Sequence, residues 1–419
     1  MEAHSEAKKQ SLLAVWREIY RPEVKIGRYL SVLALWGISY GFYRGVQDNY
    51  LAQVVGITNF ERGIVEFFRE IPGLLVVLIL AWMYKFTATR ILKISIAVAA
   101  AGTAGLLLSG TGKLIVVAFM VLFSFGEHII MPVRTTLSLS MAKPEKAGAS
   151  LGIISMIGNM GNIAGFLAVT GLFILFGRLG FSRIDLIPFK IIFAVSTALM
   201  VLAFFISLAM KETNAQINRR RFYFHKKFFK YYMLEVFYGA RKQIFITFAP
   251  YVLILHYGAD TSIISLLLAI CAAFGILFSP LMGKLIDHLG YKFVMVTDTL
   301  LLIAVCFFYG FAHRIFPRDI AFIVVCINYV LDSIISLASM ASNVYVQDIA
   351  DNGEEITATL STGISVNHVI SILIALLGGW LWKMAGIEVL FSLSAFLGLL
   401  NTIYAATIKK SEKSKRQGL

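Results

Sequence analysis

The chain has 419 residues, of which 58% are hydrophobic and 15% are charged, and its formal net charge is +14. Soluble proteins carry about 25% charged residues, so this composition excludes an ordinary soluble domain. The basic residues lie in short gaps between apolar runs and not on one surface, which argues against a nucleic-acid-binding protein.

The first segment, residues 1–28, is polar apart from a short apolar stretch. That stretch is too short for the core of a cleavable signal peptide, so we expect the segment to stay on the protein as a cytoplasmic leader. Leu12, Trp16, Ile19 and Tyr20 share one face of a helix. This pattern fits either a helix lying on the inner membrane surface or a plain hydrophilic leader.

Apolar runs of about 20 residues, the length that crosses a hydrocarbon core of about 30 Å, predict an all-α membrane protein with twelve transmembrane helices. The predicted spans are 29–54, 62–84, 90–109, 114–134, 148–176, 188–210, 231–255, 261–282, 293–312, 320–345, 357–381 and 387–408. Lys and Arg concentrate in alternate connections, which places both termini in the cytoplasm. We therefore expect a multi-pass protein of the plasma (inner) membrane.

The longest polar connection divides the predicted spans into two sets of six. The expected units are a six-helix bundle over 29–210, a basic cytoplasmic linker over 211–230, a second six-helix bundle over 231–408 and a cytoplasmic tail over 409–419. The halves resemble each other, because the stretch from Gly73 to Arg90 aligns without gaps with the stretch from Gly275 to Lys292. Parallel pseudo-repeats of this kind place a binding site on the axis between the halves.

The first predicted span carries a polar stripe. Ionisable groups inside a membrane cost on the order of 2.5–3.5 kcal/mol by insertion scales, so they normally face a cavity or a partner. The stripe follows helical spacing and consists of Tyr40, Tyr43, Arg44, Gln47 and Asp48. We expect it to face water or substrate, although Arg44 and Asp48 also have the spacing of a local ion pair.

Other spans carry further ionisable groups. Glu66, Arg69 and Glu70 in the second span have the spacing of a charge cluster near one end of the helix, and we assign them to a gate together with Arg134 of the fourth span. The seventh and tenth spans add candidates for the wall of a substrate cavity, namely Tyr238, Arg241, Lys242 and Asn328.

Two carboxylates, Glu127 and Asp332, occupy comparable depths in the fourth and tenth spans. Burial raises the pKa of a carboxyl group, which suits reversible protonation during a transport cycle. Either of them is therefore a candidate for proton coupling. The alternative is that each is permanently paired with a neighbouring cation.

Cofactor and metal sites are not expected. The three cysteines lie inside apolar runs without metal or redox spacing, and His128 and His368 are lone histidines on separate predicted spans. The chain contains no Gly-x-x-x-x-Gly-Lys-Ser/Thr phosphate loop, so an ATP-driven pump is disfavoured. A membrane-embedded enzyme and a sensor remain alternatives to a transporter.

The connection after the eighth span reads Gly283-Lys284-Leu285-Ile286-Asp287-His288-Leu289-Gly290-Tyr291-Lys292. It resembles the Gly-x-Leu-x-Asp-x-x-Gly-x-Lys/Arg signature of the major facilitator superfamily, which recurs in cytoplasmic loops 2-3 and 8-9. The copy in loop 2-3 is degraded, with Lys85 in place of the Asp and Arg90 retained. The resemblance implies a secondary transporter with helices 1, 4, 7 and 10 around a central cavity, and it identifies no subfamily.

In this superfamily the signature loop of one half abuts the start of helix 5 or 11 in the other half. Here Asp287 would face Lys146, and Lys85 would face Glu354 and Glu355. The resemblance therefore predicts a cytoplasmic latch of two ion pairs with exchanged signs. The alternative is that these charges form no latch. Lys85 then reflects only the excess of basic residues on the cytoplasmic side, and Glu354 and Glu355 only stabilise the N-terminus of their helix.

The expected partners are a small organic solute, membrane lipid and protons. Arg44, Arg241 and Lys242 can hold a carboxylate or phosphate, and the tyrosines of the same spans can cover an organic body, so we expect the solute to be anionic or zwitterionic. We expect the protein to be a monomer.

Overall fold

The computed structural model describes residues 16, 18–212 and 223–408. All regular structure in this part of the chain is helical, apart from one isolated bridge between Tyr20 and Ala142. The Arg219-Arg220-Arg221 run of the predicted linker, most of the leader and the predicted tail lie outside the described residues.

The long helices follow the predicted spans. They are α2 (Ile26–Asn49), α3 (Asn59–Trp82), α4 (Ala88–Leu108), α5 (Lys113–Met141), α6 (Ala147–Arg178), α7 (Leu186–Leu208), α8 (Phe229–Leu255), α9 (Thr261–Leu289), α10 (Tyr291–Ile315), α11 (Arg318–Ile335), α12 (Met340–Ile349) and α13 (Gly353–Ala406). A five-residue π-helix (Tyr50–Val54) continues α2, and 3-10 turns lie at Pro144–Lys146, Lys226–Phe228 and Ser336–Ser339. Inside α13, Gly386 has φ 87°, so two helical stretches meet there.

Within the described residues, eight helical stretches are long and apolar enough to cross a membrane. Helices α2, α3 and α8 are not among them, and these helices carry the clustered arginines, lysines and carboxylates of the predicted site. The count of twelve spans stays a prediction.

The signature segment is not the loop that the sequence predicts. Helix α9 continues to Leu289 and α10 begins at Tyr291, so a single residue, Gly290, makes the turn. Its φ of 83° lies in the left-handed region that favours glycine. The correction follows from helix length, because helices can extend beyond the apolar run that spans the lipid.

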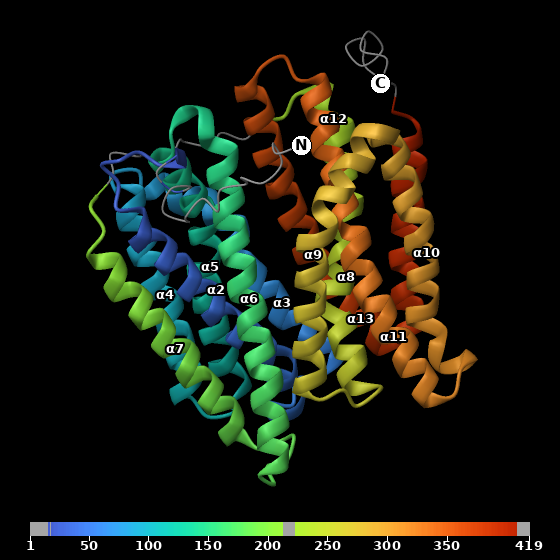
Figure 1. Cartoon of the computed structure of the whole chain (residues 1–419). Coiled ribbons are helices and arrows are strands. Elements are labelled where there is room, and N and C mark those ends of the chain that lie inside the picture. The colour runs from blue at the N-terminus through green and yellow to red at the C-terminus, as the bar shows by residue number, and fades with distance from the viewer. Residues whose placement is uncertain (1–15, 17, 213–222, 409–419) are drawn as a thin grey trace, which may run out of the picture.

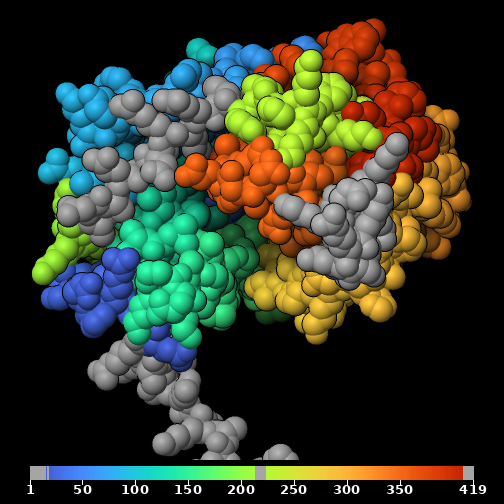
Figure 2. All heavy atoms as spheres, turned by 90° about the horizontal axis from the view of Figure 1, so that it is seen from above, coloured from blue at the N-terminus to red at the C-terminus, as the bar shows by residue number. Residues whose placement is uncertain are grey.

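The helices form two groups that lie side by side (Figure 1), with the blue-to-green part of the chain on one side and the yellow-to-red part on the other. The view from above shows the same division (Figure 2). One core cluster is built from residues before position 211 with Tyr251, and two others come from residues after position 227. We call these sets the first and the second helix group.

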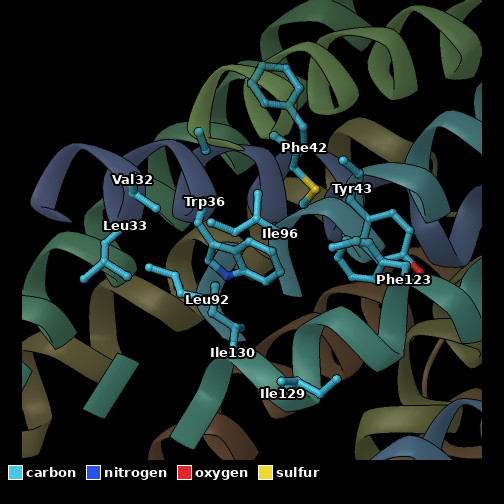
Figure 3. Packing of buried hydrophobic residues seen from close by; sticks show 14 of the residues in the cluster. Val32, Leu33, Trp36, Phe42, Tyr43, Leu92, Ile96, Phe123, Ile129 and Ile130 are labelled. Atoms are coloured by element: carbon cyan, nitrogen blue, oxygen red, sulfur yellow. The ribbon is translucent and has the colours of Figure 1, made fainter. Parts of the chain in front are cut away.

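The core of the first group lies between α2, α4 and α5 (Figure 3). Trp36 stacks on Phe123 with ring centroids 6.3 Å apart, and Leu92 and Ile96 of α4 belong to the same buried cluster. This packing fixes one face of α2 and leaves another face for the second group.

The described part of the leader packs on the junction between α5 and α6. Ile19 and Tyr20 are buried, the Lys143 amide donates to the Ile19 carbonyl at 3.0 Å, and Arg21 Nε donates to the Ala142 carbonyl at 3.1 Å. Ile19 and Tyr20 therefore contact protein and not a lipid surface.

The two groups touch where α2 ends and α9 begins. Asn49 donates to the Ala259 carbonyl at 3.0 Å, and Ser265 donates to the Phe166 carbonyl at 2.8 Å. At Gly63 of α3, a Cβ atom would lie 2.3 Å from the Ala375 carbonyl oxygen of α13. Glycine is thus needed there for the close approach of the two backbones.

Candidate functional site

A cavity of about 500 Å³ lies between the two helix groups. Helices α2, α3 and α5 line it from one side, and α8, α9, α11 and α13 line it from the other. Its ionisable lining residues are Arg44, Arg69, Glu70, Glu127, His128, Lys242, Asp332 and His368. The volume falls within the range of about 300–1,000 Å³ that is usual for small-molecule sites.

A chain of ion pairs begins beside the cavity and runs along α2 and α3. Asp48 lies 3.0 Å from Arg44 and 3.1 Å from Arg62, and Glu66 lies 2.8 Å from Arg62 and 2.6 Å from Arg69. The side chains of Arg62 and Glu66 are fully buried. Because charged groups are buried only when they are paired, this alternation of signs explains how these helices carry so many of them.

The chain of ion pairs continues into the cavity wall and reaches the second group. Arg69 lies 2.7 Å from Glu70 and 3.5 Å from Glu127. His368 Nδ1 lies 2.9 Å from a Glu70 carboxylate oxygen, and Gln243 donates to Glu66 at 3.1 Å. These two contacts join α3 to α13 and to α8.

The second group has a smaller set of charges. Arg241 pairs with Asp332 at 3.1 Å and lies over the Tyr238 ring, 5.2 Å from its centroid. Lys242 lines the cavity and has no ion pair among the described residues. Glu235 accepts hydrogen bonds from Ser342 and Asn367, each at 3.3 Å. Lys242 is therefore a cavity cation available to a bound solute.

The polar stripe of α2 does not face the cavity along its whole length, which corrects the prediction. Tyr40 and Arg44 line the cavity, whereas Tyr43, Gln47 and Asp48 are buried. Tyr43 packs on Phe123 with ring centroids 3.9 Å apart (Figure 3). The periodicity found the polar face, but the neighbouring helices cover part of it. Both interpretations of Arg44 hold, since it pairs with Asp48 and also lines the cavity.

Two predicted site residues lie elsewhere. Asn328 lines a separate apolar hollow between α10 and α11 and donates to the Val324 carbonyl of its own helix at 2.7 Å. Arg134 lines a pocket of about 190 Å³ between α2, α5 and α6, away from the Glu66, Arg69 and Glu70 cluster. Both predictions failed for the same physical reason. Helical spacing fixes the direction of a side chain around its own helix axis, but it does not fix which neighbouring helix lies in that direction.

Three features of the site were not predicted from the sequence: Arg62, Gln243 and the pairing of two histidines. Arg62 begins the second predicted span, and its position four residues before Glu66 was the signal for a buried pair. His128 and His368 are not lone side chains, because their ring centroids lie 5.4 Å apart. Sequence spacing could not predict this contact, since the two histidines come from different helix groups.

The residues of the predicted latch have other partners in this structure. Lys85 Nζ lies over the Tyr84 ring at 5.7 Å, Lys146 pairs with Glu18, and Glu355 pairs with Lys227 at 3.2 Å. Other members of the predicted set lie at helix ends: Gly283 and Asp287 in the last turns of α9, Lys292 in the first turn of α10 and Glu354 in the first turn of α13.

The retained signature cation, Arg90, pairs within the first group. It donates to Glu212 at 2.9 Å, and this hydrogen bond holds the pKa of the Glu212 carboxyl below its usual value. Because both side chains are exposed, the pair is weak and salt-sensitive.

Comparison with known proteins places the chain. The model of the Major Facilitator Superfamily matches residues 231–418, and solved structures with the same fold cover nearly the whole chain. The match to the superfamily model therefore covers the second half of the chain, and over the whole chain the likeness to the solved structures concerns the fold. The match identifies no subfamily, and no curated protein matches the sequence of this chain.

Three solved structures have a fold similar to that of this chain. The nucleoside transporter NupG is 14% identical with a TM-score of 0.68, covering 91% of this chain and 98% of that one. A D-xylose-proton symporter is 13% identical with a TM-score of 0.71, covering 92% and 98%. An auto-inhibited POT family peptide transporter is 11% identical with a TM-score of 0.72, covering 92% and 97%. At these identities the likeness concerns the fold alone.

Proposed function

We propose that the chain is a secondary transporter that moves a small organic anion or zwitterion by alternating access. The observation that supports this most directly is the charged cavity between the two helix groups. A site on the axis between two bundles becomes accessible from either side of the membrane when the bundles rock about it. The structurally similar transporters carry small solutes, as their names state.

The proposed solute class rests on the partners of the cavity charges. Arg44 and Arg69 are engaged by carboxylates, whereas Lys242 has no such partner among the described residues. An ammonium group beside a cavity attracts a carboxylate or phosphate, and the paired acidic groups opposite suit a solute that also carries a positive charge. Lys242 is therefore the proposed anchor for the anionic group.

Transport is tested with purified protein in liposomes and a panel of labelled organic anions and zwitterions. Wild-type protein should show solute-specific flux without ATP. Lys242→Met should raise the KM for that solute at least tenfold. A tenfold change in affinity corresponds to a loss of about 1.4 kcal/mol of binding free energy. Lys284→Met, an exposed lysine near the end of α9, is the matched control and should leave the KM unchanged.

If no solute crosses while reconstituted protein keeps its fold, a sensor or membrane-embedded enzyme becomes the better description. If flux occurs and Lys242→Met has the wild-type KM, the transport proposal stands and the anchor is wrong.

Proton coupling is proposed for Glu127 or Asp332, because both carboxylates line the cavity and lie in opposite helix groups. Among the described residues, each has one arginine partner: Glu127 lies 3.5 Å from Arg69 and Asp332 lies 3.1 Å from Arg241. A carboxylate in such a place can exchange its proton with water when its partner moves. Glu127→Gln or Asp332→Asn should then abolish accumulation driven by a pH gradient and leave solute exchange intact. Accumulation by both variants would place coupling elsewhere.

A further inference from the structure

The cavity wall brings together three side chains that can bind a metal ion: Glu70, His128 and His368. Each offers one ligand atom, and these atoms lie within 4.8 Å of one another. Glu70 and His128 are buried and His368 is half-buried. Two imidazoles and a carboxylate form a donor set that suits first-row divalent ions such as Zn²⁺. The set is invisible in the sequence because its members come from α3, α5 and α13.

The hydrogen bonds around His128 leave its Nε2 atom free to bind a cation. The Ser124 hydroxyl donates to the Arg69 carbonyl oxygen at 2.6 Å, which commits its only proton. Nδ1 of His128 lies 3.0 Å from that hydroxyl oxygen and 2.9 Å from the Ser124 carbonyl oxygen, both of which then accept. Nδ1 therefore carries the proton, and Nε2 keeps a lone pair. Metal-bound histidines are usually oriented in this way by a hydrogen bond at the other nitrogen.

A glycine makes room for both imidazole rings. At Gly73 of α3, a Cβ atom would lie 2.8 Å from Nε2 of His128 and 2.8 Å from Cε1 of His368. The rings stand at 69° to each other beside this glycine. The helix backbone thus forms a cradle in which the two rings approach each other, and any side chain at this position would displace them.

The ion-pair network that contains Glu70 does not oppose a bound cation. It has three arginines and four carboxylates, so its formal charge is −1, and Lys242 lines the same cavity from the second group. Its members are Arg44, Arg62, Arg69, Asp48, Glu66, Glu70 and Glu127. Arg69 lies beside the three ligands, but it contacts three of the carboxylates, so its charge is already compensated.

We propose that Glu70, His128 and His368 form a binding site for a divalent transition-metal ion of the Zn²⁺ type, and that the bound ion holds the two helix groups together. Glu70 and His128 belong to the first group and His368 to the second, so an ion bound by all three bridges them. A ligand that binds one conformation favours that conformation. The ion therefore stabilises the state in which α3 and α13 are closed against each other.

The position of the site agrees with a bridging role. Helices α3 and α13 form a seam that runs from Gly63, which faces the Ala375 carbonyl, to Gly73, which faces His368. The Glu70 contact with His368 lies on the same seam at 2.9 Å. Separation of the helix groups along this seam would pull His368 away from the other two ligands. Metal binding does not depend on the transport proposal.

Metal binding is measured on the purified full-length protein by titrating chelator-stripped samples with ZnCl₂ in a calorimeter. His256 and His313, whose rings lie 4.9 Å apart, are first changed to Asn so that only one histidine pair remains. We expect one Zn²⁺ per chain and at least a tenfold loss of affinity in His128→Asn and in His368→Asn. His288→Asn, an exposed histidine on α9, is the matched control and should bind as tightly as its parent. Melting curves without metal check that each variant is folded.

Co²⁺ supplies a direct signature of the ligands, because its visible absorption bands report imidazole and carboxylate coordination. The bands should appear with the parent protein and disappear in both histidine variants. Absence of stoichiometric Zn²⁺ binding, or equal binding by the folded His128→Asn and His368→Asn variants, would overturn the site.

Spin labels at Glu145 and Lys284, which are exposed on different helix groups, test the bridge. Zn²⁺ should narrow the distribution of distances between the labels in the parent protein and have no effect in His368→Asn. Zn²⁺ that binds without changing the distribution in the parent would show that the ion does not hold the groups together.

Discussion

Arg62 is the buried centre of the ion-pair chain, and its removal should be costly. Its guanidinium lies between Asp48 and Glu66, at 3.1 and 2.8 Å, and its side chain is fully buried. It also lies over the Tyr251 ring of the second group, 5.4 Å from the centroid. Arg62→Met keeps most of the volume and removes only the charge and the hydrogen bonds.

The magnitude follows from what the substitution leaves behind. Removing one partner of a buried pair costs about 3–5 kcal/mol, because the other charge stays buried without compensation. Here each carboxylate keeps one arginine, Arg44 for Asp48 and Arg69 for Glu66. We therefore expect the lower end of that range, about 3 kcal/mol, which is roughly a 100-fold change in the unfolding equilibrium.

Unfolding in mixed micelles by increasing SDS, followed by circular dichroism, measures this loss. Arg90→Met is the matched control, because it removes an arginine from an exposed pair with Glu212 and should cost at most about 1 kcal/mol. Adding Asp48→Asn to Arg62→Met should recover part of the stability, since it removes the excess negative charge that Arg62→Met leaves in the buried network. Equal losses in Arg62→Met and Arg90→Met would refute the assignment of Arg62 as a buried structural charge.

Two further experiments with substituted proteins test how the helix groups move. Gly63→Ala places a Cβ atom 2.3 Å from the Ala375 carbonyl oxygen, so it should separate α3 from α13. Cysteines introduced beside Gly63 should then react faster with a water-soluble thiol reagent. Unchanged reactivity would mean that α3 and α13 are not in tight contact in the membrane. For the proposed latch, Lys85→Glu should favour opening at the end near the termini, and adding Glu354→Lys and Glu355→Lys should restore the original spin-label distances, whereas additive damage would argue against the pairing.

The sequence predicted the helices well because apolar length is a property of single segments. Every predicted span coincides with a helical stretch of the described residues. The boundaries were less accurate where amphipathic turns extend a helix beyond its apolar run, as at Leu289 in the signature segment. The sharp turns at Gly290 and Gly386 depend on single residues with positive φ, which a hydropathy profile does not detect.

The site was only partly predictable, because its decisive contacts join separate helices. The spacing of Glu66, Arg69 and Glu70 gave the local cluster, and all three lie in the observed network. The same spacing gave no information on Glu70 with His368, or on Glu66 with Gln243, because each pair is contributed by both helix groups. Helical periodicity assigns a face to a residue, and only packing decides what that face meets.

The division of contacts in the network bears on how the helix groups can rock. The ion pairs of Arg62 and Arg69 stay within the first group, so they can persist when the groups move. The polar links from this network to the second group are the hydrogen bonds of Gln243 to Glu66 and of His368 to Glu70. A hydrogen bond to a charged group contributes about 1.5–3 kcal/mol, so separating the groups costs a few kcal/mol at this level of the protein. New contacts formed elsewhere between the groups, such as the proposed latch of Lys85 with Glu354 and Glu355, would contribute enough free energy to offset part of that cost. Strong charges can therefore remain buried in one group while a weaker set of links sets the balance between conformations.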